Sequence, residues 1–295
     1  KYIVSFEWDK VPTWTYRIGG VLLKKEICFR SDHFRLYIRY TLLEAHSATT
    51  LRLKPYLAFR SVRHWTQENG KANTAYQPIE NGLKMCLYEG YPELFMQTDT
   101  PCTYHHDPNW YKGLDYPKER ERGYYSSEDL LVPGYLEMPI KKGESIIFTA
   151  SLREKEPALL KPLMEEEMAK AAPHDSLYHC LVHAAHQFRV QKEGEEYILA
   201  GYPWFKSRAR DLFIALPGLT LSIGETEAFE TYMRTAEKAL RNLISNEPIS
   251  VDIHEMEQPD TVLWAIWCIQ QYGKYVGRQK CYEKYGALLK DLVKY

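Results

Sequence analysis

The sequence predicts two domains of different secondary structure: an antiparallel β-sandwich over residues 1–152 and an all-helical domain over residues 175–295. In the first part apolar and polar residues alternate with the two-residue period of half-buried strands. From Pro157 onward the apolar residues recur at helical spacing instead. With 295 residues the chain is long enough for two domains that each have a core.

The expected strands of the first part alternate clearly, and they include FRLYIRYTLL, TTLRLKPYLAF, NGLKMCLYEG and ESIIFTASL. Turn signals rich in glycine and asparagine separate them, at residues 19–20, 68–70 and 142–143. Strands punctuated by such turns, with little helical pattern between them, favour an antiparallel sandwich. Residues 99–133 are polar and aromatic, so we expect a long loop over the sheet there.

The sequence of the second part predicts a linker helix within residues 153–174, which is followed by the helices of the second domain. Pro157 suits the first turn of the linker helix. Asp175 or Ser176 can cap the next helix, DSLYHCLVHAAHQFRV. Further helical patterns follow in RDLFIALPGLTL, ETEAFETYMRTAEKALRNLI, PDTVLWAIWCIQQYGKYV and KCYEKYGALLKDLVKY. About five or six helices of ordinary length are therefore expected.

Composition and charge indicate a soluble globular protein and exclude two partner classes. Hydrophobic residues make up 45% and the net charge is −1, so no overall field favours nucleic acid or an anionic membrane. No apolar run approaches the roughly 20 residues that cross a bilayer. The six cysteines form no CxxC pair, which favours a reducing, cytoplasmic setting. The chain lacks an initiator Met, so we expect that an upstream segment is missing.

The aromatic content points toward carbohydrate. Seven Trp and 23 Tyr are a high aromatic content for one chain. Their rings can fill cores, but they can also stack on sugar rings while their polar atoms bond to hydroxyls. Composition alone leaves both interpretations open.

Three histidines stand on one face of a predicted helix, where their spacing could hold a metal ion. His179, His183 and His186 are separated by four and three residues. The glutamate of a zinc-protease helix is missing between them, so a polar helix face is the better interpretation. We expect neither a metal nor a cofactor.

Two aspartates at helix starts are the candidates for chemistry. AGYPWFKSRARDLFIALPGLTL places Asp211 after a run of aromatic and basic residues, and PDTVLWAIWCIQQY places Asp260 four residues before Trp264. An aspartate in this position is also favoured by capping and by the helix dipole. The residues alone therefore allow either a structural or a catalytic role.

These motifs resemble the glycogen debranching enzymes of the amylo-α-1,6-glucosidase kind. GYPWF, RDLFIALPGL and DTVLWAIWCIQQY are similar to the start of that family's catalytic domain. PTWTYRIGGVLLKKEI, LRLKPYLAFRSVRHW and ERERGYYSSEDLLVPGYL are similar to its N-terminal sandwich. The resemblance implies a partial (α/α)6 barrel over residues 175–295. It also implies an inverting glycoside hydrolase that removes α-1,6-linked glucosyl stubs from glycogen or limit dextrins.

The resemblance also assigns residues. It implies that Asp211 is the catalytic acid, and that the glucan contacts Tyr202, Trp204, Phe205, Arg210, Asp260 and Trp264. We expect the second catalytic carboxylate beyond Tyr295, so that this fragment alone is inactive.

The chain departs from the family pattern at residues 207–209, where Ser-Arg-Ala replaces Asp-Trp-Gly, and at His186, where the family usually has Asp. The first departure supports an alternative, a glucan-binding homologue that has lost turnover. Another alternative is a related barrel enzyme, either a trehalase-like hydrolase or a disaccharide phosphorylase. Arg208 lies three residues before Asp211, within reach on a helix, and we expect it to point to solvent instead.

Overall fold

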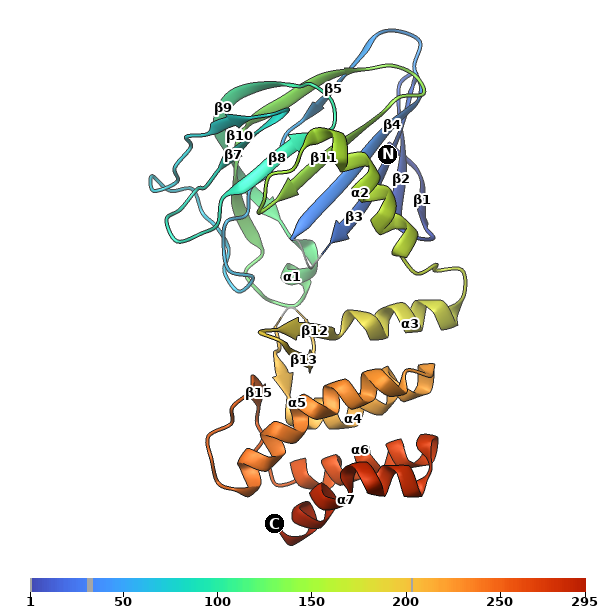
Figure 1. Ribbon diagram of the computed structural model, residues 1–295. Coiled ribbons are helices and arrows are strands. Elements are labelled where there is room, and N and C mark those ends of the chain that lie inside the picture. Colours follow the sequence, from blue (N-terminus) through green and yellow to red (C-terminus); the bar gives the residue numbers. More distant parts are fainter. Residues whose placement is uncertain (1, 31–33, 203) are drawn as a thin grey trace. The chain divides into compact units, whose positions relative to one another are not determined.

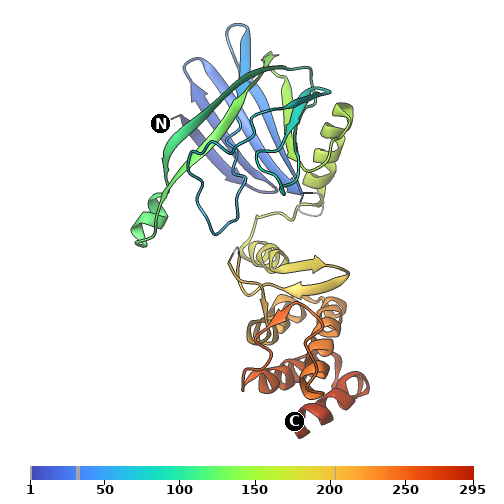
Figure 2. The ribbon, with the colours of Figure 1, turned by 90° about the vertical axis from the view of Figure 1, so that its left-hand side faces the viewer.

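The computed structural model describes residues 2–30, 34–202 and 204–295. The chain divides into two compact units, Lys1–His174 and Asp175–Tyr295 (Figures 1 and 2). Pro203 of the predicted GYPWF motif lies outside the described residues.

The described residues of the first unit form two antiparallel sheets. The larger has eight strands in the order β1-β2-β3-β4-β11-β8-β7-β6. Along the chain these are β1 (Ile3–Trp8), β2 (Pro12–Ile18), β3 (Val21–Arg30), β4 (Arg35–Glu44), β6 (Gln77–Ile79), β7 (Gly82–Met85), β8 (Leu94–Thr98) and β11 (Ser145–Ser151). The smaller sheet has the order β5-β10-β9, from β5 (Thr49–Leu53), β9 (Thr103–Asp115) and β10 (Ser127–Ile140).

A shared core holds the two sheets together. Leu42 and Met96 of the larger sheet belong to one buried cluster with Leu136 and Met138 of β10. Along β10 the residues at positions 136, 138 and 140 are buried, while those between them are more exposed. This period of two is the alternation from which the sequence predicts strands. The antiparallel sheets predicted for the first part of the chain are therefore present.

The loop predicted over residues 99–133 is wrong, because most of this stretch forms β9 and the start of β10, with the short helix α1 (Pro117–Glu121) between them. The polar and aromatic residues pair across the two strands. The rings of His105 and Tyr135, for example, stand opposite each other in register and stack with their centroids 4.6 Å apart. Aromatic cross-strand pairs also contribute to the stability of a sheet.

The helix expected at residues 153–174 exists as α2 (Pro157–Lys170), with Pro157 at its start as predicted. It packs on β3, β8 and β11, and Figure 1 shows it lying along the larger sheet. Leu160 and Met164 of α2 are fully buried in a cluster that includes Tyr37 and Ile147 of the sheet. The helix is thus an integral part of the first unit rather than a connection outside it.

The second unit contains five α-helices among its described residues. They are α3 (Leu177–Gln187), α4 (Ala209–Leu219), α5 (Thr226–Ile244), α6 (Thr261–Val276) and α7 (Arg278–Lys294), with a short 3-10 turn η2 (Leu221–Ile223) after α4. Helix α4 packs against α6, and α6 packs against α7. Phe213, Phe229 and Tyr272 are fully buried in the core of this unit. The predicted cap of α3 is confirmed at Ser176, whose Oγ accepts a hydrogen bond from the His179 backbone N–H at 3.2 Å.

The second unit is not all-helical, which corrects the sequence prediction. A hairpin of β12 (Arg189–Lys192) and β13 (Glu195–Ile198) follows α3. Its two connecting residues, Glu193 and Gly194, both have positive φ values, of 54° and 82°. Such a pair forms the tight turn that joins two twisted strands. Two further short strands, β14 (Ser207–Arg208) and β15 (Ile253–His254), pair in parallel.

Among the described residues, no helix is both long enough and apolar enough to cross a lipid bilayer.

Candidate active site

A short parallel pairing brings the two predicted site segments together. Ser207 pairs with Ile253, and Arg208 pairs with His254, so the start of α4 lies beside the segment that leads into α6. Buried Ala209, Leu212 and Phe213 anchor α4 in the core. The side chains at the start of α4 that face away from that core are then held at a defined place.

Arg210, Asp260 and Trp264 form one connected group at the starts of α4 and α6. Arg210 Nη2 donates to Asp260 Oδ1 at 2.9 Å, and Trp264 Nε1 donates to Asp260 Oδ2 at 3.1 Å. The hydrogen bond from Arg210 lowers the pKa of Asp260, with a smaller lowering from Trp264, and the same bond raises the pKa of Arg210. Asp260 therefore stays a carboxylate that orients a guanidinium and an indole.

Arg208 is held by two neighbours instead of pointing freely to solvent, which corrects the expectation from the sequence. Its guanidinium carbon lies 4.7 Å from the centroid of the Phe205 ring. Its Nε is 3.4 Å from Glu255 Oε1. Glu255 has a φ of 60°, a left-handed conformation that is uncommon for a residue other than glycine.

Asp211 is the third residue of α4 and is exposed. Within the described part of the chain, neither an ion pair nor a side-chain hydrogen bond engages its carboxylate, although Arg208 and Arg210 both come shortly before it in the sequence. Each of these arginines is bound to a different acidic residue, Glu255 and Asp260 respectively. The carboxyl group of Asp211 is accordingly accessible and is not held in an ion pair.

The aromatic residues before α4 are all exposed, with 46% of Tyr202, 46% of Trp204 and 48% of Phe205 accessible to solvent. Tyr202 donates its hydroxyl hydrogen bond to Gln187 Oε1 at 3.0 Å and stacks on Phe188 with ring centroids 5.0 Å apart. Partial burial raises the pKa of Tyr202, so its phenol stays protonated near neutral pH. Exposed rings of this kind can stack on the apolar face of a sugar.

The structure thus joins Arg210, Asp260 and Trp264 directly, with Asp211 next to Arg210 in the same helical turn. Phe205 joins them through Arg208 and the β14–β15 pairing. Sequence reasoning missed Glu255, because nothing in the pattern of the loop before α6 marks it as a partner for Arg208. Only the pairing of β14 with β15 brings the two residues together.

His179 and His186 of α3 have separate partners. His179 Nδ1 is 2.5 Å from Asp175 Oδ1, and His186 Nε2 is 2.7 Å from Glu225 Oε1. Partial burial by itself raises the pKa of Glu225. Together, the hydrogen bonds from Arg189 and His186 and the charges of these residues lower it by more, so the pKa lies below its usual value. No group of three metal-ligating side chains occurs among the residues that the structure describes.

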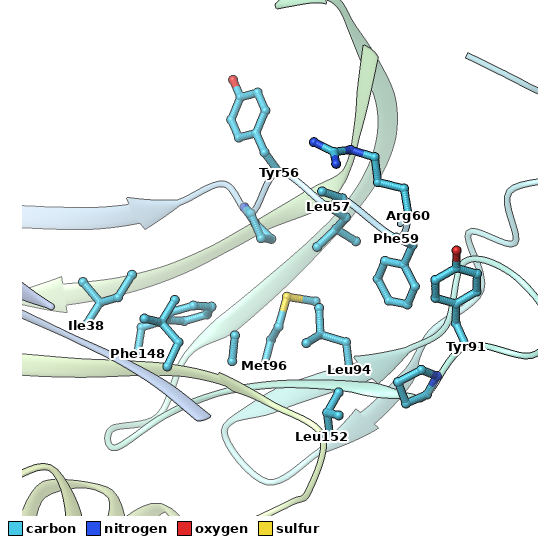
Figure 3. A pocket seen from close by; sticks show the side chains of 15 residues that line it. Ile38, Tyr56, Leu57, Phe59, Arg60, Tyr91, Leu94, Met96, Phe148 and Leu152 are labelled. Atoms are coloured by element: carbon cyan, nitrogen blue, oxygen red, sulfur yellow. The ribbon is translucent and has the colours of Figure 1, made fainter. Parts of the chain in front are cut away.

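A pocket of about 470 Å³ lies in the first unit, between the larger sheet and the segment that follows β5 (Figure 3). Its lining is mostly apolar, with Ile38, Met96 and Phe148 from the sheet, and Phe59 and Tyr91 at one end (Figure 3). No aspartate or glutamate is among the described residues that line it.

Known proteins are similar to this chain in fold and in sequence. A search of curated proteins gave no match. The chain is similar in fold to a bacterial glucoamylase whose crystal structure is a complex with acarbose, with a TM-score of 0.52 and 15% sequence identity. That match covers 100% of this chain and 49% of the glucoamylase chain, so the chain spans about half the length of its structural relative.

Two family models also match, and they follow each other along the chain. The model described as glycogen debranching enzyme N terminal matches residues 1–147. The model described as amylo-alpha-1,6-glucosidase matches residues 182–295, which include the starts of α4 and α6. With both models matched in this order, the chain belongs to the glycogen debranching enzyme family.

Proposed function

We propose that the chain carries part of the active site of a glycoside hydrolase that removes α-1,6-linked glucosyl stubs from glycogen or limit dextrins. The observation that carries the proposal is the free carboxyl group of Asp211 beside the connected group of Arg210, Asp260 and Trp264. A general acid must be accessible and must not be locked in an ion pair, because it has to give a proton to the leaving oxygen. Asp211 meets both conditions.

The neighbouring side chains have roles that suit a sugar ring. Asp260 orients Arg210, whose remaining N–H groups can donate to glucosyl hydroxyls. Trp264 and the exposed rings of Tyr202, Trp204 and Phe205 offer stacking surfaces. The structural relative is a complex with acarbose, which supports an oligosaccharide ligand for this fold. No metal or cofactor is needed for such a hydrolysis.

The helical arrangement supports the first part of an (α/α)6 barrel. The starts of α4 and α6 meet at the contact between Arg210 and Asp260, and the two helices pack side by side. Helices α5 and α7 each follow one of them in the chain. In this proposal residues 1–152 form the N-terminal domain, residues 175–295 begin the catalytic barrel, and their partner is glycogen or an α-glucan oligosaccharide. The six free cysteines favour a reducing, cytoplasmic compartment.

The reaction proposed is a single displacement with inversion. One carboxylic acid, Asp211, protonates the glycosidic oxygen while a second carboxylate activates water, and the two groups are expected to lie about 6.5–9.5 Å apart. We assign no residue to the second role.

The test is glucose release from a limit dextrin by the natural full-length protein, compared with its Asp211→Asn variant. General acid catalysis contributes about 10²–10⁴-fold, so we expect a loss of at least roughly 100-fold in kcat. Inversion predicts that the first glucose released is the β-anomer, which ¹H NMR detects. Glucose release that survives the substitution would exclude Asp211 as the acid. Binding of the dextrin without any turnover in the unaltered protein would favour the glucan-binding homologue.

A further inference from the structure

Two arginines, Arg208 and Arg210, come shortly before Asp211 in the sequence, and each of them is paired with another carboxylate. Arg210 is bound to Asp260 at 2.9 Å. Arg208 is the residue that immediately precedes α4, and Asp211 is the third residue of the helix. Side chains at these two positions lie within reach of each other at a helix start. An arginine at this position without another partner would therefore pair with Asp211.

Glu255 supplies that other partner. Its Oε1 lies 3.4 Å from Arg208 Nε, while the guanidinium of Arg208 lies over the ring of Phe205 at 4.7 Å. The pairing of Arg208 with His254 in the β14–β15 ladder places Glu255, the next residue, beside the arginine. Glu255 adopts a left-handed backbone conformation to continue from there. Conformations of this kind persist where the surrounding structure imposes them, and they cluster at functional sites.

We propose that Glu255 is a positioning residue, which holds Arg208 against Phe205 and thereby leaves Asp211 without an ion-pair partner. The inference rests on the proposed function, because only an acid that gives up a proton needs to be kept free. With Arg208 held by Glu255, an arginine at position 208 is compatible with a catalytic acid at position 211. The two arginines that come shortly before Asp211, Arg208 and Arg210, are each paired with one carboxylate, Glu255 and Asp260 respectively.

The test follows the Arg208 Nε–Hε signal in ¹⁵N-labelled protein, which is identified by its loss in Arg208→Lys. Asp211→Asn is introduced into the unaltered protein and into the Glu255→Gln variant. We expect Asp211→Asn to leave the Arg208 signal in place in the unaltered protein. In the Glu255→Gln background we expect the same substitution to shift the signal, because Arg208 then pairs with Asp211.

Glu257→Gln is the matched control, because it removes an exposed carboxylate from the same loop, and no ion pair joins Glu257 to a described arginine. In that background Asp211→Asn should again leave the Arg208 signal in place. A shift in the unaltered protein, or no shift in the Glu255→Gln background, would overturn the proposal. The experiment needs no substrate, so its failure is distinct from a failure of the proposed hydrolysis.

Discussion

The buried ion pair between Arg60 and Glu128 gives the sharpest prediction for the first unit. The Glu128 side chain is 0% exposed and that of Arg60 is 20% exposed. Glu128 accepts two hydrogen bonds from Arg60, one from the Tyr116 hydroxyl at 2.7 Å and one from the Thr66 backbone N–H at 3.1 Å. Burial by itself raises the pKa of Glu128. Together these hydrogen bonds and the charge of Arg60 lower it by more, so the pKa lies below its usual value.

Glu128→Gln removes the charge while it keeps nearly the same shape. Arg60 is then left mostly buried without a counter-ion, and breaking a buried pair in this way costs about 3–5 kcal/mol. For a unit of this size each kcal/mol lowers Tm by about 2–4 °C, so we expect a decrease of roughly 6–20 °C. Differential scanning calorimetry measures this decrease in the transition of the first unit.

Glu137→Gln is the matched control, since Glu137 lies on the same strand and its bond to Arg52 is at the surface. Exposed ion pairs contribute little to stability, so this variant should keep the Tm of the unaltered protein. Equal transition temperatures for the two variants would refute the reasoning, because the contribution of an ion pair to stability would then not depend on its burial.

Two further predictions concern the second unit. Because the pKa of Glu225 lies below its usual value, its contacts with Arg189 and His186 stabilise the fold fully above about pH 4.5. That contribution is lost as the pH falls through the folded-state pKa, and urea unfolding of Glu225→Gln should show a weaker dependence on pH in this range. Asp260→Asn removes the charge that orients Arg210. It should therefore raise KM for a branched dextrin, while Tm stays close to that of the unaltered protein. An unchanged KM would show that Arg210 does not contact the glucan.

The periodicity of apolar residues was enough to predict the two kinds of secondary structure, because burial of one face controls both strands and helices. It was not enough for β9, where polar and aromatic residues, such as His105 with its ring stacked on Tyr135, interrupt a regular apolar alternation. The β12–β13 hairpin was missed for another reason. Its turn at Glu193-Gly194 carries the signal, but the short strands on either side continue the apolar pattern of α3.

The candidate site could be predicted in part. Asp260 and Trp264 are four residues apart at the start of one helix. Side chains at this spacing are neighbours on the helix surface, independently of the tertiary structure. Their contact with Arg210 follows from the packing of α4 on α6, which the family resemblance implied and local sequence did not. The pairing of Arg208 with Glu255 depends on a two-residue parallel ladder between segments 45 residues apart in the chain. Local periodicity contains no information about such a contact.

The role of Asp211 as general acid is tested most directly by changing the leaving group. Fluoride departs with little need for protonation, whereas the oxygen of an α-1,6 glucosidic bond needs a proton from the acid. Hydrolysis of α-glucosyl fluoride and of limit dextrin is measured for the natural full-length protein and for Asp211→Asn. We predict that the variant loses activity on the dextrin and keeps most of its activity on the fluoride. An equal loss on both substrates, or no loss on either, would contradict the assignment of Asp211 as the acid.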